Sequence, residues 1–225
     1  MKKKKDSSDF TSFQNLCIRI LAQSDNCQES QDLFHAAKTI PELVSAWKRY
    51  WAGLLHEVPE QVIEAFSKFY PDYRSEIIRA GVYYNEEPPS DTFNSIVLVG
   101  DKGSVCGDAI ATLKITGRHR VFVLGDLHVS CHGNCNILVN SLRANVDIHD
   151  SCRCNIEAGT VSAHDRTIVT GKGNVACYDS STIYMMGGTL HDHGHFAITA
   201  YNDAVVHSFT DRKIILNDKS RLIVA

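Results

Sequence analysis

From about residue 120 onward, turn-forming residues recur in two interleaved series, and each series repeats about every 15 residues. One series is His132-Gly133, His149-Asp150, His164-Asp165, Tyr178-Asp179, His193-Gly194 and Thr210-Asp211. The other is Gly125-Asp126, Asn140-Ser141, Ala158-Gly159, Lys172-Gly173, Gly187-Gly188, Asn202-Asp203 and Asn217-Asp218. Two alternating turns per repeat indicate a coil with two strands and two corners. Since one coil cannot bury its own apolar side, the coils must stack, which predicts a β-solenoid (a single-stranded β-helix) of about seven coils.

An ordinary β-sandwich or barrel is the alternative, because it also places a strand about every 8 to 12 residues. Its hairpins, however, do not require two alternating kinds of corner. Loops of a sandwich also commonly contain proline, and this part of the chain has none. The pattern therefore favours the solenoid.

The composition changes near residue 90. All five prolines and both tryptophans lie at or before Pro89, and so do eight of the nine glutamates. Glutamate favours helices and proline is excluded from paired strands, so the earlier part is predicted to be helical and the later part β-rich. The predicted class is α+β in two domains. We divide the chain into a basic flexible tail (1–8), a helical domain (9–87), a linker (88–92) and the solenoid (93–225).

The helical domain is predicted to be a small bundle of four or five helices. Thr39 precedes Pro41, which is a typical start for a helix, because threonine caps the first turn and proline fits within it. Apolar side chains then recur every three or four residues. The aromatic members of these stripes, which we expect to form the core, are Trp47, Trp51, Phe66 and Phe69.

Three stretches of the repeat, residues 132–139, 178–185 and 201–208, carry His or Tyr at the first position, and the second and third positions hold Gly, Asp, Asn or Ser. They resemble the degenerate Tyr/His-Gly/Asp-Asn-Ala-x-Val-x-Ala arrays of some bacterial and phage-derived β-helical proteins. The general architecture is also similar to the bactofilin-type cytoskeletal solenoids, although the helical domain departs from that pattern. The resemblance covers about 120 residues and implies a fold, not an activity. Residues 9–87 resemble no family that we recognise.

Histidines are concentrated in the solenoid and allow two interpretations. Residues at the same corner of successive coils should stack as a ladder with a spacing of about 4.8 Å. This predicted corner ladder comprises His132, His149, His164, Tyr178 and His193. The second interpretation is a transition-metal site, for example for zinc, because imidazoles and a carboxylate are its usual ligands. Its ligands would be His191, Asp192, His193 and His195.

Catalysis has little support in the sequence, and we assign no catalytic residue. The serines, histidines and aspartates show no nucleophile elbow. The Gly-rich segment at residues 100–104 lacks the spacing of a phosphate-binding loop. An enzyme is therefore less expected than a binding protein, and we expect no cofactor unless the metal site exists.

The charge and the termini limit the possible partners. The net charge of −3 argues against nucleic acid as a partner for the surface as a whole. Lys2, Lys3, Lys4 and Lys5 form either a solvated end or a contact for nucleic acid or anionic lipid. No apolar run reaches about 18 residues, so no membrane-spanning helix is expected. Eight cysteines without a secretory signal indicate reduced thiols in the cytoplasm.

Residues 220–225 read as a strand without a polar cap, which would leave an open coil. We therefore expect a homo-oligomer that self-associates through Leu222, Ile223 and Val224. The leading hypothesis is a non-enzymatic scaffold with a helical head that binds an unidentified protein. The alternative is a metal-binding protein or metal-dependent enzyme that uses the cluster at residues 191–195.

Overall fold

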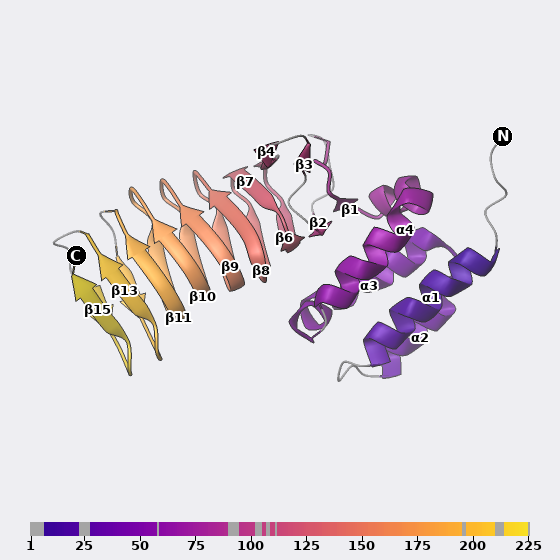
Figure 1. The fold of residues 1–225 in the computed structure, drawn as a ribbon, viewed down its shortest axis with the longest axis horizontal. Coiled ribbons are helices and arrows are strands. Elements are labelled where there is room, and N and C mark those ends of the chain that lie inside the picture. The colour runs from indigo at the N-terminus through magenta and orange to yellow at the C-terminus, as the bar shows by residue number, and fades with distance from the viewer. Residues whose placement is uncertain are drawn as a thin grey trace. The chain divides into compact units, whose positions relative to one another are not determined.

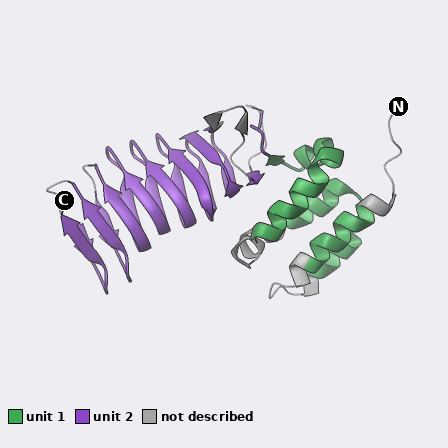
Figure 2. Ribbon diagram, in the orientation of Figure 1, with its two compact units in different colours: residues 1–84 green, residues 85–225 purple. Residues whose placement is uncertain are grey.

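The computed structural model describes residues 7–22, 28–57, 59–89, 95–101, 105–106, 109–110, 112–194, 197–209 and 214–224. The chain divides into two compact units, residues 1–84 and residues 85–225 (Figure 2). The first unit is helical and the second is a parallel β-solenoid of about 8 turns, so the predicted fold class is confirmed. No helix among the described residues is long and apolar enough to span a membrane.

The first unit contains four helices in its described part (Figure 1). They are α1 (Ser7–Ala22), α2 (Gln28–Ala36), α3 (Ile40–Glu57) and α4 (Pro59–Arg79), followed by the short strand β1 (Val82–Tyr84). The start of α3 is capped as its sequence predicts, since the Glu42 backbone N–H donates to Thr39 Oγ1 at 3.4 Å. Pro71 lies inside α4, and Tyr73 has non-helical dihedral angles (φ −121°, ψ 21°). The helix α4 is therefore kinked next to this proline.

Aromatic side chains form the core of the helical unit. Trp47 and Phe66 are fully buried, and their ring centroids lie 5.5 Å apart in an edge-to-face arrangement. Phe13 stacks on Phe69 at 4.6 Å. Three of the four predicted core aromatics therefore lie in the core, and the side chain of Trp51 lies outside the described set.

The solenoid begins with β2 (Ser95–Asp101) and ends with β15 (Arg221–Val224). Two short strands, β3 (Val105–Cys106) and β4 (Ala109–Ile110), pair in antiparallel fashion. The other strands pair in parallel. They are β5 (Thr112–Gly117), β6 (Arg120–Asp126), β7 (His128–Gly133), β8 (Asn136–Ile148), β9 (Arg153–Ala163), β10 (Ile168–Cys177), β11 (Thr182–Asp192), β12 (Ile198–Ala200), β13 (Val205–Ser208) and β14 (Ile214–Leu216).

Each turn of the solenoid contributes to two parallel faces. The first face has the order β2-β6-β8-β9-β10-β11-β12-β14. The second face runs from β5 and β7 through the later halves of β8 to β11, and then to β13 and β15. The four long strands thus pass from one face to the other around a corner, where the register shifts in the pairings of β8 with β9, β9 with β10 and β10 with β11. The corner from the second face to the next turn carries the first turn series, and the corner within each turn carries the second.

The number of turns is about 8, one more than the sequence indicates. The additional turn is built by β2 and β5. The run from Ile96 to Val99 in β2 is buried at every position, so it lacks the alternation that marks the strands from β7 to β11. It also precedes the first recognisable corner.

Inward side chains at equal register form apolar columns through the solenoid. One column is Leu113, Val129, Val146, Val161, Val175, Leu190, Val206 and Leu222. A second is Ile96, Val121, Ile137, Cys154, Val169, Ile183, Ile198 and Ile214. All members except those of the last turn are buried. Stacking of these columns is the burial that no single coil achieves alone.

Candidate functional site

The corner that follows each second-face strand carries a continuous column of aromatic rings, the corner column. Ring centroids lie 4.4 Å apart for His132 and His149, and 4.7 Å apart for His149 and His164. The stack continues from His164 to Tyr178 at 4.7 Å and from Tyr178 to His193 at 5.3 Å. The interplanar angles are 4°, 8°, 5° and 11°, so the rings are nearly parallel. All five residues singled out in the sequence as a ladder are thus brought together.

Phe209 extends the corner column beyond the residues that the sequence suggested. Its ring stacks on His193 at 4.6 Å. The sequence series placed Thr210-Asp211 at this corner, one residue further along the chain, and both of these residues lie outside the described set. The sequence signal for this extension was the aromatic residue one position before the expected turn.

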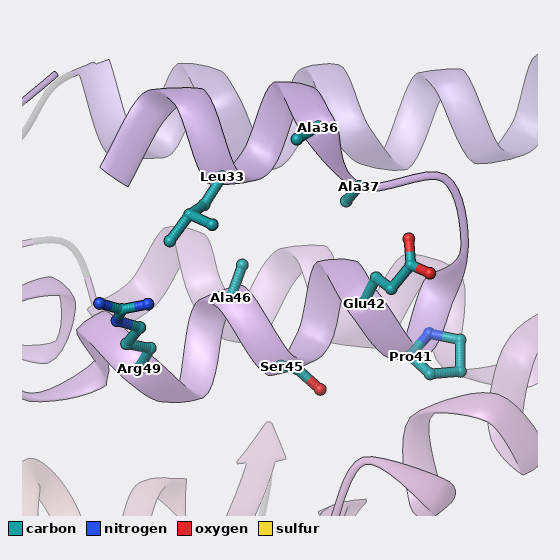
Figure 3. A pocket seen from close by; sticks show the side chains of 8 residues that line it. All are labelled: Leu33, Ala36, Ala37, Pro41, Glu42, Ser45, Ala46 and Arg49. Carbon is teal, nitrogen blue, oxygen red and sulfur yellow. The ribbon is translucent and has the colours of Figure 1, made fainter. Parts of the chain in front are cut away.

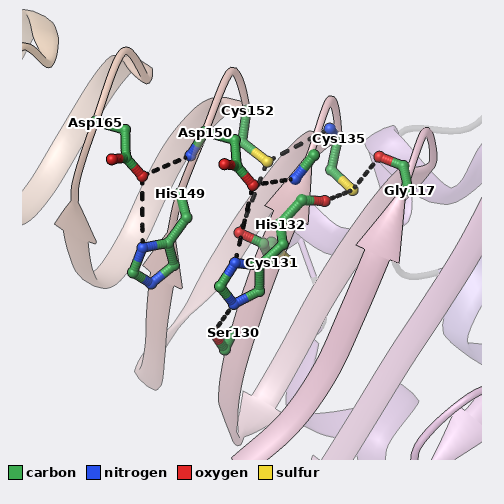
Figure 4. Close-up of polar contacts among 10 residues, drawn as sticks. Gly117, Ser130, Cys131, His132, Cys135, His149, Asp150, Cys152 and Asp165 are labelled. Atoms are coloured by element: carbon green, nitrogen blue, oxygen red, sulfur yellow. Dashed lines mark hydrogen bonds and ion pairs between the residues drawn. The ribbon is translucent and has the colours of Figure 1, made fainter.

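Aspartates beside the corner column connect one coil to the preceding one (Figure 4). Asp150 Oδ2 accepts a hydrogen bond from the Gly133 backbone N–H at 2.7 Å, and Asp165 Oδ2 accepts one from the Asp150 N–H at 2.9 Å. Asp179 Oδ2 accepts from the Asp165 N–H at 3.2 Å. The same three carboxylates lie 3.9, 3.8 and 3.9 Å from Nδ1 of His132, His149 and His164.

The backbone explains why aspartate occupies these positions. Asp150, Asp165 and Asp179 have φ values of 60°, 55° and 50°, in the left-handed region. Among residues with a side chain, aspartate and asparagine adopt this region at the lowest cost. The residue after each ring therefore makes the turn, and its carboxylate also bonds to the backbone of the neighbouring coil. The corner column and its aspartates therefore hold successive turns together, and we call them the spine of the solenoid. The side chains of His132, His149 and His164 remain 39%, 29% and 30% exposed.

Buried cysteines lie next to the spine. Cys135 and Cys152 are neighbours in successive coils, and the Cys135 backbone N–H donates to Cys152 Sγ at 3.4 Å. A hydrogen bond from the Cys152 thiol lowers the pKa of Cys135, and burial opposes that shift. The same hydrogen bond, together with burial, raises the pKa of Cys152. Burial raises the pKa of Cys131 and Cys154 as well.

The proposed metal ligands do not converge in the described part of the chain. His191 and His193 are exposed and belong to different stacks, His191 with His207 at 5.1 Å and His193 with Tyr178. Asp192 is fully buried and accepts hydrogen bonds from the Ser208 hydroxyl at 3.0 Å and the Gly194 N–H at 3.2 Å. Within the described residues, no group of three or more His, Cys, Asp and Glu side chains could hold a metal ion. His195 lies outside the described residues.

The physical reason is the alternation of a strand. Successive side chains of β11 point to opposite faces, so Asp192 points inward while the histidines on either side point outward. Asp192 continues the inward column of Cys177 and Ala163. A set of ligands contiguous in sequence is therefore divided between the interior and the surface.

The last turn that the structure describes has an exposed strand edge. In the described part of the chain, β14 pairs with β12 alone. Likewise β15 pairs with β13 alone (Figure 1). Leu222 and Val224 continue inward columns that are buried in earlier turns, yet they are 40% and 73% exposed. Ile223 lies on the outer face at the register position of His207 and is also exposed. Lys2 to Lys5, the other predicted contact, lie outside the described residues.

A groove between α2 and α3 is a feature that the sequence reasoning did not find (Figure 3). It has a volume of about 470 Å³ and is lined by Leu33, Ala36, Ala37, Pro41, Glu42, Ser45, Ala46 and Arg49. Small residues let the two helices enclose a groove without filling it. Their recurrence at adjacent helical positions was a signal in the sequence, but it does not distinguish a groove from a close helix contact.

The comparisons with known proteins identify no family for this chain. The solenoid implied by the resemblance to octapeptide-repeat proteins is present, and no family is identified. No protein-family model, no curated protein and no solved structure matches this chain.

Proposed function

We propose that the protein is a non-enzymatic scaffold that self-associates through the last turn of its solenoid and binds a partner through its helical unit. The observation that carries this proposal is the exposure of residues at core positions in β14 and β15. Leu222 occupies the register position of Val206 and Leu190, which are fully buried. Exposed apolar columns and a strand edge without a further strand in the described part of the chain both promote pairing with another strand.

A second copy offers a matching surface. Two last turns related by a two-fold axis would pair β15 with β15 in antiparallel fashion and bring both sets of inward columns together. Complete burial of a Leu or Val side chain contributes about 1.5–3 kcal/mol, so the exposed fractions of Leu222 and Val224 would contribute roughly 2–3 kcal/mol per copy. Since association itself costs several kcal/mol, we expect a reversible, concentration-dependent contact.

The stacked spine supports a mechanical role for the solenoid. Aspartate carboxylates join the successive turns between Gly133 and Asp179, and ring stacks join those between His132 and Phe209. A repeat of this kind transmits contacts along one axis. The cytoplasm is the compartment that this proposal assumes. It is supported by the six cysteines with described side chains, which are all buried thiols.

The test is the mass of the full chain as a function of concentration, measured by sedimentation and light scattering. The double variant Leu222→Lys/Val224→Lys, the tail variant, should lose at least tenfold in self-association through this edge, because it places two charges on the inward columns. Tyr184→Lys is the matched control, since Tyr184 is 43% exposed on β11 and lies away from the edge. Self-association that is equally strong in the tail variant, with the fold checked by circular dichroism, would refute the proposal.

A further inference from the structure

We infer that the groove between α2 and α3 is a two-fold interface that seats α3 of a second copy of this chain. The inference rests on the proposed scaffold function and names the partner of its helical unit. Its basis is the arrangement of charge and side-chain size along α3, where Glu42 and Arg49 lie at opposite ends of the groove (Figure 3).

The groove-lining residues of α3 form one stripe. Glu42, Ser45, Ala46 and Arg49 are spaced by three, four and seven residues, which places them on one side of a helix. The two charged residues are two turns apart, about 10 Å along the axis. The stripe therefore has an acidic end, a small-residue centre and a basic end.

This order is self-complementary under a two-fold axis. Glu42 and Arg49 share the same midpoint as Ser45 and Ala46, so an antiparallel second α3 would place its Arg49 opposite Glu42 and its Glu42 opposite Arg49. At the centre, Ser45 of each copy would face Ala46 of the other. Small side chains at a crossing point let two helices approach closely, and identical patches that match each other define an isologous interface.

The walls of the groove accommodate such a helix. Ala37 and Ala46 are buried and form its floor, while Leu33 projects from α2 along one side (Figure 3). Glu42 is held in position, because its Oε2 accepts a hydrogen bond from the Lys38 backbone N–H at 2.8 Å. A carboxylate accepts several hydrogen bonds, so this contact leaves capacity for a guanidinium. A partner helix of one charge sign would meet repulsion at one end of the groove, whereas a second copy meets attraction at both.

Two isologous interfaces on one chain have a further consequence. One at the helical unit and one at the last solenoid turn would join copies alternately head to head and tail to tail. Such an assembly does not close, so its average mass should increase with concentration. Blocking either interface should reduce the assembly to a dimer.

The experiment uses the full chain in the tail-variant background, so that only the helical interface remains. The tail variant should be a dimer at high concentration, and Glu42→Arg or Arg49→Glu should weaken this dimer by about tenfold or more, because each places like charges opposite one another. An equimolar mixture of the two single variants should form a heterodimer, since a stripe with two arginines then faces a stripe with two glutamates and both charge pairs are attractive. The combined variant Glu42→Arg/Arg49→Glu should dimerise again.

Two further variants control for stability. Glu42→Gln keeps an acceptor for the Lys38 N–H and removes the charge, so it should weaken the dimer without unfolding α3. Glu60→Arg makes the same charge change in the first turn of α4, outside the groove, and should leave the dimer unchanged.

The outcomes separate the two proposals. The helical interface would be overturned by a monomeric tail variant. It would also be overturned if the single variants dimerise as well as their parent and their mixture is no more stable. Either result would count even if the wild-type chain self-associates through the last turn of its solenoid. If instead the Glu42→Arg variant of the otherwise wild-type chain is a monomer, the proposed interface at the last solenoid turn is refuted, whereas the helical interface is supported. Capture of a different protein by the groove, unaffected by charge exchange, would also overturn the inference.

Discussion

The spine of the solenoid allows one prediction to be developed in detail, at Asp165. Its carboxylate accepts a hydrogen bond from the Asp150 N–H at 2.9 Å and lies 3.8 Å from His149 Nδ1. Its backbone has φ 55°. The residue therefore performs two functions, bonding between coils and left-handed backbone at the corner, and three substitutions separate them.

Asp165→Asn keeps an acceptor and tolerates the left-handed backbone, so it should cost about 0.5 kcal/mol of unfolding free energy. Asp165→Gly loses the hydrogen bond, about 1 kcal/mol, and adds the entropy of glycine, which gives about 1.5–2 kcal/mol in total. Asp165→Ala loses the same bond and adds a left-handed strain of about 1–2 kcal/mol, for a total of about 2–3 kcal/mol. We take the lower range for the hydrogen bond because the Asp165 side chain is 51% exposed.

The assay is urea unfolding followed by circular dichroism, together with hydrogen exchange at the Asp150 amide. Protection of this amide should decrease in the Gly and Ala variants and remain in the Asn variant. Asp147→Ala is a control, because Asp147 lies on a strand outside the left-handed region. If Ala is no more destabilising than Gly, the backbone argument is wrong. If Asn is as destabilising as Ala, neither the hydrogen bond nor the backbone explains the residue.

Two other predictions concern buried groups. Asp192→Ala should cost about 3 kcal/mol, since it removes the acceptor of the Ser208 hydroxyl and the Gly194 N–H inside the solenoid, whereas Asp192→Asn should cost less than half as much. Thermal unfolding of both variants tests this, and equal losses would contradict it. Burial raises the pKa of Cys17 and Cys154, so the unfolded chain loses these protons first as the pH rises, and stability should fall above pH 9 by about 1.4 kcal/mol per pH unit per thiol. Urea titrations at pH 8, 9 and 10 measure how the unfolding free energy changes with pH. Cys154→Ala should reduce this slope by the contribution of one thiol. A flat profile would contradict the raised pKa values.

Much of the architecture follows from periodicity alone. Two alternating turn series require two corners per coil, and coils with one apolar side must stack, so the solenoid could be predicted without any structure. Residues at the same place in one series must then lie above one another, which is why His132, His149, His164, Tyr178 and His193 could be grouped in advance. The apolar stripes that contain Trp47 and Phe66 likewise predicted the aromatic core of the helical unit.

Other features were decided only by the tertiary structure, because they depend on which atoms of different turns meet. The sequence could not show that Asp165 bonds the backbone of the preceding coil, since this depends on the register between strands. It grouped His191, Asp192 and His193 as neighbours, but the alternation of β11 separates the buried carboxylate from the exposed rings. The groove beside Ala46 depends on the distance between α2 and α3, which sequence spacing does not fix. Periodicity thus determined the repeat of this protein, while register and packing decided which side chains face one another.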